Sequence, residues 1–293
     1  MQKGKIETVS TGKTVGICVL AYLLVIISQV AALLIGQGVN SMGAPMAVGS
    51  IVSAVLYLAL ALKCISFISR KILKTDMEKC RITSKISLRP LWVVSAFVLP
   101  ALVILMVTRT AGNWSITSMN AEELSYAIVD AAAYYGLAAG IVEEAMFRGV
   151  IMTVLEQRWN RYAAVIAPSV LFGLSHIIGA DLDFLSTIQL IVAGSLVGIL
   201  FSLVTLESGN IWNSALMHAV WNTLLVGGIL HIGVSRNDLF IFNYTLDSRS
   251  FLVTGGDFGV EASVFAVIGY GIFILIAAWM LRRKRIKCTV FCE

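Results

Sequence analysis

The sequence has few charged residues and lacks the patterns of a soluble domain. Charged side chains make up 13% of the chain and hydrophobic ones 58%, and the mean hydropathy is +0.87. So apolar a composition excludes an ordinary water-soluble globule. The apolar runs are continuous and show no period-two alternation, so strands are not expected. The sequence therefore predicts an all-α, polytopic integral membrane protein.

Several signatures of metal, redox and transport chemistry are also absent. None of the five cysteines falls in a loop predicted to lie outside the cell, so structural disulfides are not expected. The chain has no C-x-x-C pair and no His-Glu-x-x-His helix, the usual signature of a zincin. It shows no internal repeat of the kind that marks inverted-repeat transporters.

Eight apolar stretches are long enough, or nearly so, to cross a bilayer as helices of about 20 residues each. The loops 69–90 and 231–261 are too short and too polar to form cores of their own. Residues 1–293 are therefore predicted to form a single membrane domain, with loop 231–261 irregular. The eight stretches lie near Val15–Ile35, Met46–Ile68, Leu91–Thr108, Tyr126–Glu156, Tyr162–Ile178, Phe184–Leu206, Ile211–Leu230 and Ala262–Leu281.

Lysine and arginine gather in alternate loops. They are frequent in both tails, in loop 69–90 and after the fourth stretch, whereas the opposite loops hold only Arg109, Arg236 and Arg249. By the positive-inside rule, we expect a multi-pass protein of the cell membrane with both termini in the cytoplasm. Loop 69–90 is then cytoplasmic and loop 231–261 outside. The net charge of +5 reflects this topology, so we expect contact with membrane lipids and no nucleic-acid partner.

Three ionisable residues, Glu143, Glu144 and Arg148, interrupt the fourth apolar stretch. Each charge at the centre of a membrane helix costs about 2.5–3.5 kcal/mol even on the lowest scales, so such residues are normally paired and functional. Glu144 and Arg148 are four residues apart and share a helix face. Glu143 is rotated about 100° from Glu144. We therefore expect Glu144 and Arg148 to form a supporting ion pair and Glu143 to point into a cavity.

Two later stretches each carry a histidine with a partner one helical turn away: Phe172 with His176, and His218 with Asn222. Counted at about 1.5 Å per residue from the inner helix ends, these residues and Glu143 fall at depths that allow one buried cavity, open to the cytoplasmic side. A carboxylate and an imidazole can remove the proton of a water as it attacks a carbonyl. A second imidazole and an amide can bind the resulting oxyanion.

Two kinds of hydrolytic site fit these residues. In the first, Glu143 and His176 activate the water, His218 and Asn222 bind the oxyanion, and no cofactor is needed. In the second, Glu143, His176 and His218 bind zinc as a site of two histidines and one glutamate with an open water position.

The three motifs, in this order, resemble those of the CPBP family, the CAAX prenyl endopeptidases and bacteriocin-processing proteins, also called the Abi family. Glu143-Glu144-Ala-Met-Phe-Arg148 matches the Glu-Glu-x-x-x-Arg helix of the family. Phe172-Gly-Leu-Ser-His176 matches the Phe-x-x-x-His helix, and His218-Ala-Val-Trp-Asn222 matches the His-x-x-x-Asn helix. The resemblance covers residues 136–223.

The resemblance implies an eight-helix intramembrane endopeptidase that acts on hydrophobic peptides or on lipidated or membrane-bound proteins. Many relatives are labelled metalloproteases, but the eukaryotic branch resembles a glutamic protease, and that type is favoured here over a zinc enzyme. Bacterial relatives are linked to peptide processing and bacteriocin immunity. The roles implied are water activation by Glu143 and His176, an oxyanion site at His218 and Asn222, and support from Glu144, Arg148 and Phe172.

Two other functions stay open at this point. The protein could be a non-catalytic immunity or regulatory protein of the same family, which keeps the motifs as a structural network. It could also be a proton-coupled transporter that uses the glutamates as a relay.

Overall fold

The computed structural model describes residues 10–290, with side chains to residue 284. The two tails used in the orientation prediction, and the side chains of Cys288 and Cys292, lie largely or wholly outside these residues. The three cysteines with described side chains, Cys18, Cys64 and Cys80, form no disulfide.

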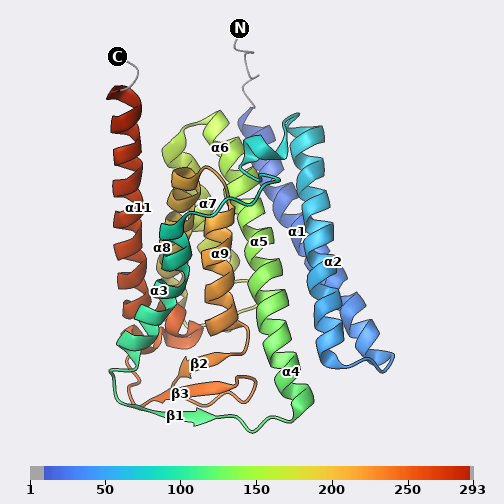
Figure 1. Ribbon diagram of the computed structural model, residues 1–293, viewed down its shortest axis with the longest axis vertical. Coiled ribbons are helices and arrows are strands. Elements are labelled where there is room, and N and C mark those ends of the chain that lie inside the picture. Colours follow the sequence, from blue (N-terminus) through green and yellow to red (C-terminus); the bar gives the residue numbers. More distant parts are fainter. Residues whose placement is uncertain (1–9, 291–293) are drawn as a thin grey trace.

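The protein is a bundle of helices with a small sheet at one end (Figure 1). It is mostly helical, as predicted. The α-helices are α1 (Thr11–Ser41), α2 (Met46–Phe67), α3 (Pro90–Val107), α4 (Ala121–Val129), α5 (Gly140–Glu144), α6 (Met152–Arg158), α7 (Arg161–Ser175), α8 (Phe184–Ser208), α9 (Trp212–Trp221), α10 (Phe251–Thr254) and α11 (Val264–Val290). Wider π-helical segments are η1 (Ile68–Ile72), η3 (Asp130–Ala139), η4 (Ala145–Ile151) and η5 (Asn222–Val226), and short 3-10 turns are η2 (Met77–Cys80), η6 (Gly256–Phe258) and η7 (Val260–Ala262). The strands are β1 (Gly112–Ile116), β2 (Leu230–Gly233) and β3 (Phe242–Leu246).

Five helices in the described part of the chain are long and apolar enough to cross a membrane. They correspond to the first, second, third, sixth and eighth predicted stretches. The bounds of the five are Thr11–Ser41, Met46–Ile72, Pro90–Val107, Phe184–Ser208 and Val264–Lys284.

The other three predicted stretches take different forms. The fourth is helical without interruption from Ala121 to Arg158, but its α-helical turns alternate with η3 and η4. The fifth is the shorter α7, of 15 residues. The seventh is α9 continued by η5 and ends at Val226, because the chain then turns into β2. A total of about eight spans therefore stays a prediction.

The expectation that the chain contains no strands was wrong. β3 lies in the middle of a three-stranded sheet, antiparallel to β1 and parallel to β2. The loop 231–261, predicted to be irregular, contains most of β2 and all of β3. The strands have only four or five residues, too few for alternation to stand out from the apolar runs beside them.

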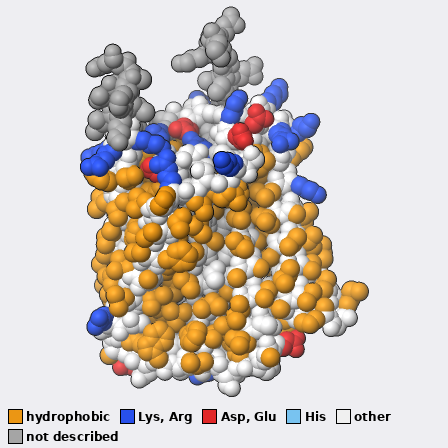
Figure 2. All heavy atoms as spheres, viewed as in Figure 1, with side chains coloured by type: hydrophobic (Ala, Val, Ile, Leu, Met, Phe, Trp, Pro, Cys, Tyr) orange, Lys and Arg blue, Asp and Glu red, His pale blue; other side chains and the backbone are white. Residues whose placement is uncertain are grey.

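The surface separates by type along the bundle (Figure 2). Most of the visible Lys and Arg side chains gather at the end opposite the sheet, which we call the basic end. Hydrophobic side chains cover the wall between the two ends, and many are exposed, such as Leu34 at 63% and Leu275 at 71%. So continuous an apolar surface is unfavourable in water and suits lipid. The protein is thus a membrane protein; which end faces the cytoplasm stays a prediction.

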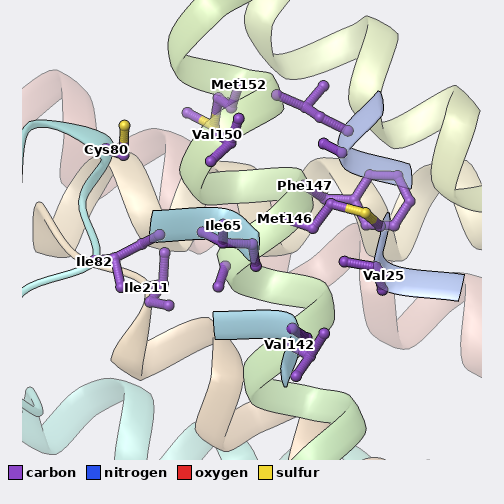
Figure 3. Packing of buried hydrophobic residues seen from close by; sticks show 14 of the residues in the cluster. Val25, Ile65, Cys80, Ile82, Val142, Met146, Phe147, Val150, Met152 and Ile211 are labelled. Carbon is purple, nitrogen blue, oxygen red and sulfur yellow. The ribbon is translucent and has the colours of Figure 1, made fainter. Parts of the chain in front are cut away.

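A buried core holds the segment from Ala121 to Arg158 against α1 and α2 (Figure 3). Val25 of α1 and Ile65 of α2 belong to the same cluster as Val142 and Met146. On its other side this segment packs against α9. The core therefore fixes α5, which carries Glu143 and Glu144, between α2 and α9.

Two glycines allow that approach. A Cβ at Gly140 would lie 3.0 Å from the backbone nitrogen of Ala219 in α9, and one at Gly136 would lie 2.2 Å from Oγ1 of Thr223. Since real side chains tolerate neither separation, both positions need glycine for α9 to lie against α5.

Candidate active site

Glu144 and Arg148 form a fully buried ion pair one helical turn apart. Nη1 of Arg148 donates to Oε1 of Glu144 at 2.9 Å, and both side chains are 0% exposed. Nη2 donates to the carbonyl oxygen of Gly198 at 3.2 Å. The guanidinium also lies 4.7 Å from the ring centroid of Phe172 and 5.4 Å from that of Phe201, within range for cation–π attraction. The pair thus ties η4 to α7 and α8.

His218 of α9 lies between the two glutamates. Its Nδ1 is 3.2 Å from Oε1 of Glu144, and its Nε2 is 3.8 Å from Oε2 of Glu143. A carboxylate that also accepts from Arg148 can only accept from the imidazole, so Nδ1 carries the hydrogen. Nε2 is the nitrogen that faces Glu143. Adjacent glutamates that point in different directions therefore both reach one imidazole.

His176 lies directly after the last residue of α7. Its Nδ1 is 2.8 Å from the backbone carbonyl of Phe172. Because a carbonyl oxygen cannot donate, this nitrogen also carries the hydrogen, and in the neutral ring the lone pair is on Nε2. The ring of Phe172 lies 4.7 Å from that of His176 and 5.7 Å from that of His218, measured between centroids. Phe172 thus holds the two imidazoles apart.

The candidate residues line two cavities that share His176, where one cavity was expected. The first, of about 50 Å³, is lined by His176, His218 and Asn222. The second, of about 140 Å³, is lined by His176 and Glu143. His176 can therefore exchange a proton with water on either side.

Neither cavity is lined by a residue of loop 69–90. The first is instead bounded by Phe258 and Glu261, which follow the sheet in sequence. An opening toward the cytoplasmic side therefore stays a prediction.

The amide of Asn222 is partly engaged. Its Nδ2 donates to the backbone carbonyl of Tyr135 at 3.1 Å. An amide nitrogen has two hydrogens, so one remains for a ligand in the first cavity.

The donor arrangement does not fit a zinc ion. Within residues 10–284, no three His, Cys, Asp or Glu side chains are grouped closely enough to hold a metal. Glu143, His176 and His218, the predicted ligands if zinc were bound, are therefore not arranged as a site of two histidines and one glutamate.

Comparison with known proteins adds the reaction class. Residues 126–224 match the family described as Type II CAAX prenyl endopeptidase Rce1-like. These residues belong to that family. The match confirms the resemblance drawn from the three motifs, and the Rce1-like segment contains all seven predicted site residues. No curated protein matches the chain.

The Rce1-like segment excludes several residues that form part of the site. Glu261 of η7 lines the first cavity, and Tyr22 of α1 and Tyr57 of α2 line the second. Sequence reasoning missed all three. The only signal for Glu261 is a carboxylate directly before the last apolar stretch, in a loop that the motifs do not reach.

Proposed function

We propose that the protein is a glutamic intramembrane endopeptidase that hydrolyses peptide bonds in hydrophobic peptides or in lipidated or membrane-bound proteins. The observation that carries the proposal is the position of His218, 3.2 Å from Glu144 and 3.8 Å from Glu143. The Rce1-like match of residues 126–224 supports the reaction class. In this proposal the protein crosses the cell membrane several times, with both termini in the cytoplasm.

The second cavity supplies the nucleophile. Its volume of about 140 Å³ has room for several waters. A water between the carboxylate of Glu143 and Nε2 of His176 gives up a proton to one of them as its oxygen attacks the carbonyl carbon of the substrate. The bond from Nδ1 of His176 to Phe172 supports this role, because it leaves the lone pair on Nε2.

The attack turns the substrate carbonyl into an oxyanion. Asn222 offers its remaining amide N–H, and His218 donates through Nε2 when its ring is protonated. The protonated ring would form ion pairs with Glu143 and Glu144. The tetrahedral intermediate then collapses: the carbon–nitrogen bond breaks, and the leaving amine takes the proton held by Glu143 or His176.

Glu144 and Arg148 act on this reaction indirectly. Glu144 fixes the ring of His218 through Nδ1, and Arg148 balances the charge of Glu144. We propose that neither residue touches the substrate, and that Phe172 serves to space the imidazoles.

We further propose that the reaction needs no metal, since Glu143, His176 and His218 are not grouped as ligands. Purified protein dialysed against a strong zinc chelator should keep its full activity. Activity that is lost on chelation and restored by zinc would contradict the metal-free mechanism.

The experiment that tests the function compares cells that express wild-type protein or Glu143→Gln at matched levels. The substitution is nearly isosteric and removes the base. A quantitative survey of peptides and protein N-termini should find membrane-derived fragments that are present with wild type and lost with the variant. Identical profiles, with the wild-type phenotype intact in the variant, would contradict proteolysis and favour a non-catalytic protein.

A further inference from the structure

Glu261 is a carboxylate in the first cavity that the proposed reaction does not use. It lies in η7, directly before α11, and lines the cavity with His176 and His218. Nε1 of Trp221 donates to its Oε2 at 2.7 Å. Its backbone carbonyl accepts a hydrogen bond from the hydroxyl of Tyr270 at 3.1 Å. These contacts hold the carboxylate at one wall of the cavity.

Glu207, at the basic end, offers a comparison within the same molecule. Its buried carboxylate also accepts a tryptophan N–H, from Trp92 at 2.8 Å, and in addition pairs with Nη1 of Arg89 at 2.5 Å. Glu261 has the tryptophan bond, but within residues 10–284 no lysine or arginine forms a salt bridge with it. A carboxylate held among apolar side chains is costly without a cation. The site of Glu261 therefore suits a positive charge from outside the chain.

The cavity limits the kind of cation. Its volume of about 50 Å³ is less than that of two waters, at about 30 Å³ each in the liquid. A compact ammonium group suits that space better than a planar guanidinium, which needs room for five N–H donors. Trp221, Phe258 and Tyr270 also line the cavity, and aromatic rings attract ammonium ions.

We propose that the first cavity is a substrate subsite, in which Glu261 binds the ammonium group of a lysine side chain next to the scissile bond. The inference rests on the proposed function, because His218 and Asn222, which bind the oxyanion in that proposal, line the same cavity. Glu261 is a specificity-determining residue and takes no part in the proton transfers.

The charges around Glu261 set the pH dependence of the subsite. Burial raises the pKa of its carboxyl, while the N–H of Trp221 and the charges of His176 and His218 lower it. Tyr270 faces it from α11, and α8 contributes only uncharged residues to the cavity. Since the ammonium needs the ionised carboxylate, binding is lost as the pH falls through the pKa of Glu261. Protonation of either histidine weakens it further.

A binding experiment tests the subsite without any turnover. The full-length protein in detergent is heated with n-butylammonium, which mimics the lysine side chain, or with n-butanol, its uncharged counterpart. Relative to n-butanol, n-butylammonium should raise the unfolding midpoint of wild type and of Glu143→Gln, but not of Glu261→Gln. An equal rise in Glu261→Gln, or no rise in wild type, would overturn the proposal.

A second experiment separates this inference from the proposed function. Peptides based on a substrate found in the survey carry lysine, arginine or norleucine beside the scissile bond. Wild type should cleave the lysine peptide best, and Glu261→Gln should lower its kcat/KM at least about tenfold, with the norleucine peptide nearly unaffected. Equal cleavage of all three by wild type refutes the subsite while leaving the protease intact. Because wild type alone gives this result, it holds even if Glu261→Gln does not fold.

The same pair of experiments also reads out the opposite case. If no fragment depends on Glu143, the protease proposal fails, yet the shift with n-butylammonium still reports whether Glu261 binds an ammonium group. A shift without proteolysis would make the cavity an amine-binding site of a different function and would overturn its assignment as a substrate subsite.

Discussion

Nδ1 of His218 lies 3.2 Å from Oε1 of Glu144, the same oxygen that accepts a hydrogen bond from Arg148. One carboxylate oxygen thus links α5, η4 and α9 at a point with no access to solvent. The two adjacent glutamates should therefore respond differently to the same substitution.

Glu144→Gln should destabilise the protein by about 3–5 kcal/mol, because it leaves the charge of Arg148 buried without a partner. Glu143→Gln should cost about 1 kcal/mol or less, since that side chain is 24% exposed and forms no ion pair with lysine or arginine. Activity should nonetheless fall about 10²–10⁴-fold in Glu143→Gln. Thermal unfolding and peptide cleavage, measured on both variants, check the contrast; equal loss of stability would contradict it.

Removing both charges should cost less than removing one. In the background of Glu144→Gln, Arg148→Met removes the unpaired guanidinium and should restore part of the lost stability. A double-mutant cycle on unfolding midpoints measures this coupling. If the two substitutions are simply additive, the buried pair does not contribute as described.

The three histidines of the chain should show two different tautomers. When neutral, His176 and His218 should carry the hydrogen on Nδ1, because that atom faces an acceptor in each case. His231 is a built-in control, since its Nε2 lies 3.1 Å from the carbonyl of Ser235 and should carry the hydrogen instead. Nitrogen-15 NMR of histidine-labelled protein distinguishes the two forms. An Nε2–H tautomer at His176 would remove the proposed base.

Gly140→Ala should separate α5 from α9. The added Cβ would lie 3.0 Å from the backbone of Ala219, so we expect a loss of about 1–3 kcal/mol and a larger loss of activity as His218 moves from the glutamates. Gly271→Ala in α11 is the matched control, because a Cβ there meets nothing within 4 Å. In a helix interior that change should be neutral or slightly stabilising. Similar behaviour of the two variants would show that the close approach is not needed.

Part of this architecture could be predicted from the sequence. The spacing of Glu144 and Arg148 predicts a shared helix face, and the structure pairs them. Five of the expected stretches are helices of the expected length, because a long apolar run has few other ways to satisfy its backbone in lipid.

Other features leave too weak a signal. The π-helical turns on both sides of Glu143 and Glu144 depend on packing against α2 and α9 and not on local residue preferences. The strands are shorter than the window over which alternation can be judged. Glu261 is more than 40 positions from the nearest motif residue, with about 1.4 charged residues expected per ten, so nothing in its spacing marks it.

The sheet has a consequence for the connectivity of the protein. β1 precedes the Rce1-like segment in the chain, whereas β2 and β3 follow it, and β3 hydrogen-bonds to both neighbours. A single cut in the exposed turn between β2 and β3 would therefore leave two polypeptides still joined by the strand ladder and by the packing of α11. Such a nicked protein should migrate as one particle until it is denatured. The two fragments, expressed separately, become candidates for reassembly into a complete enzyme.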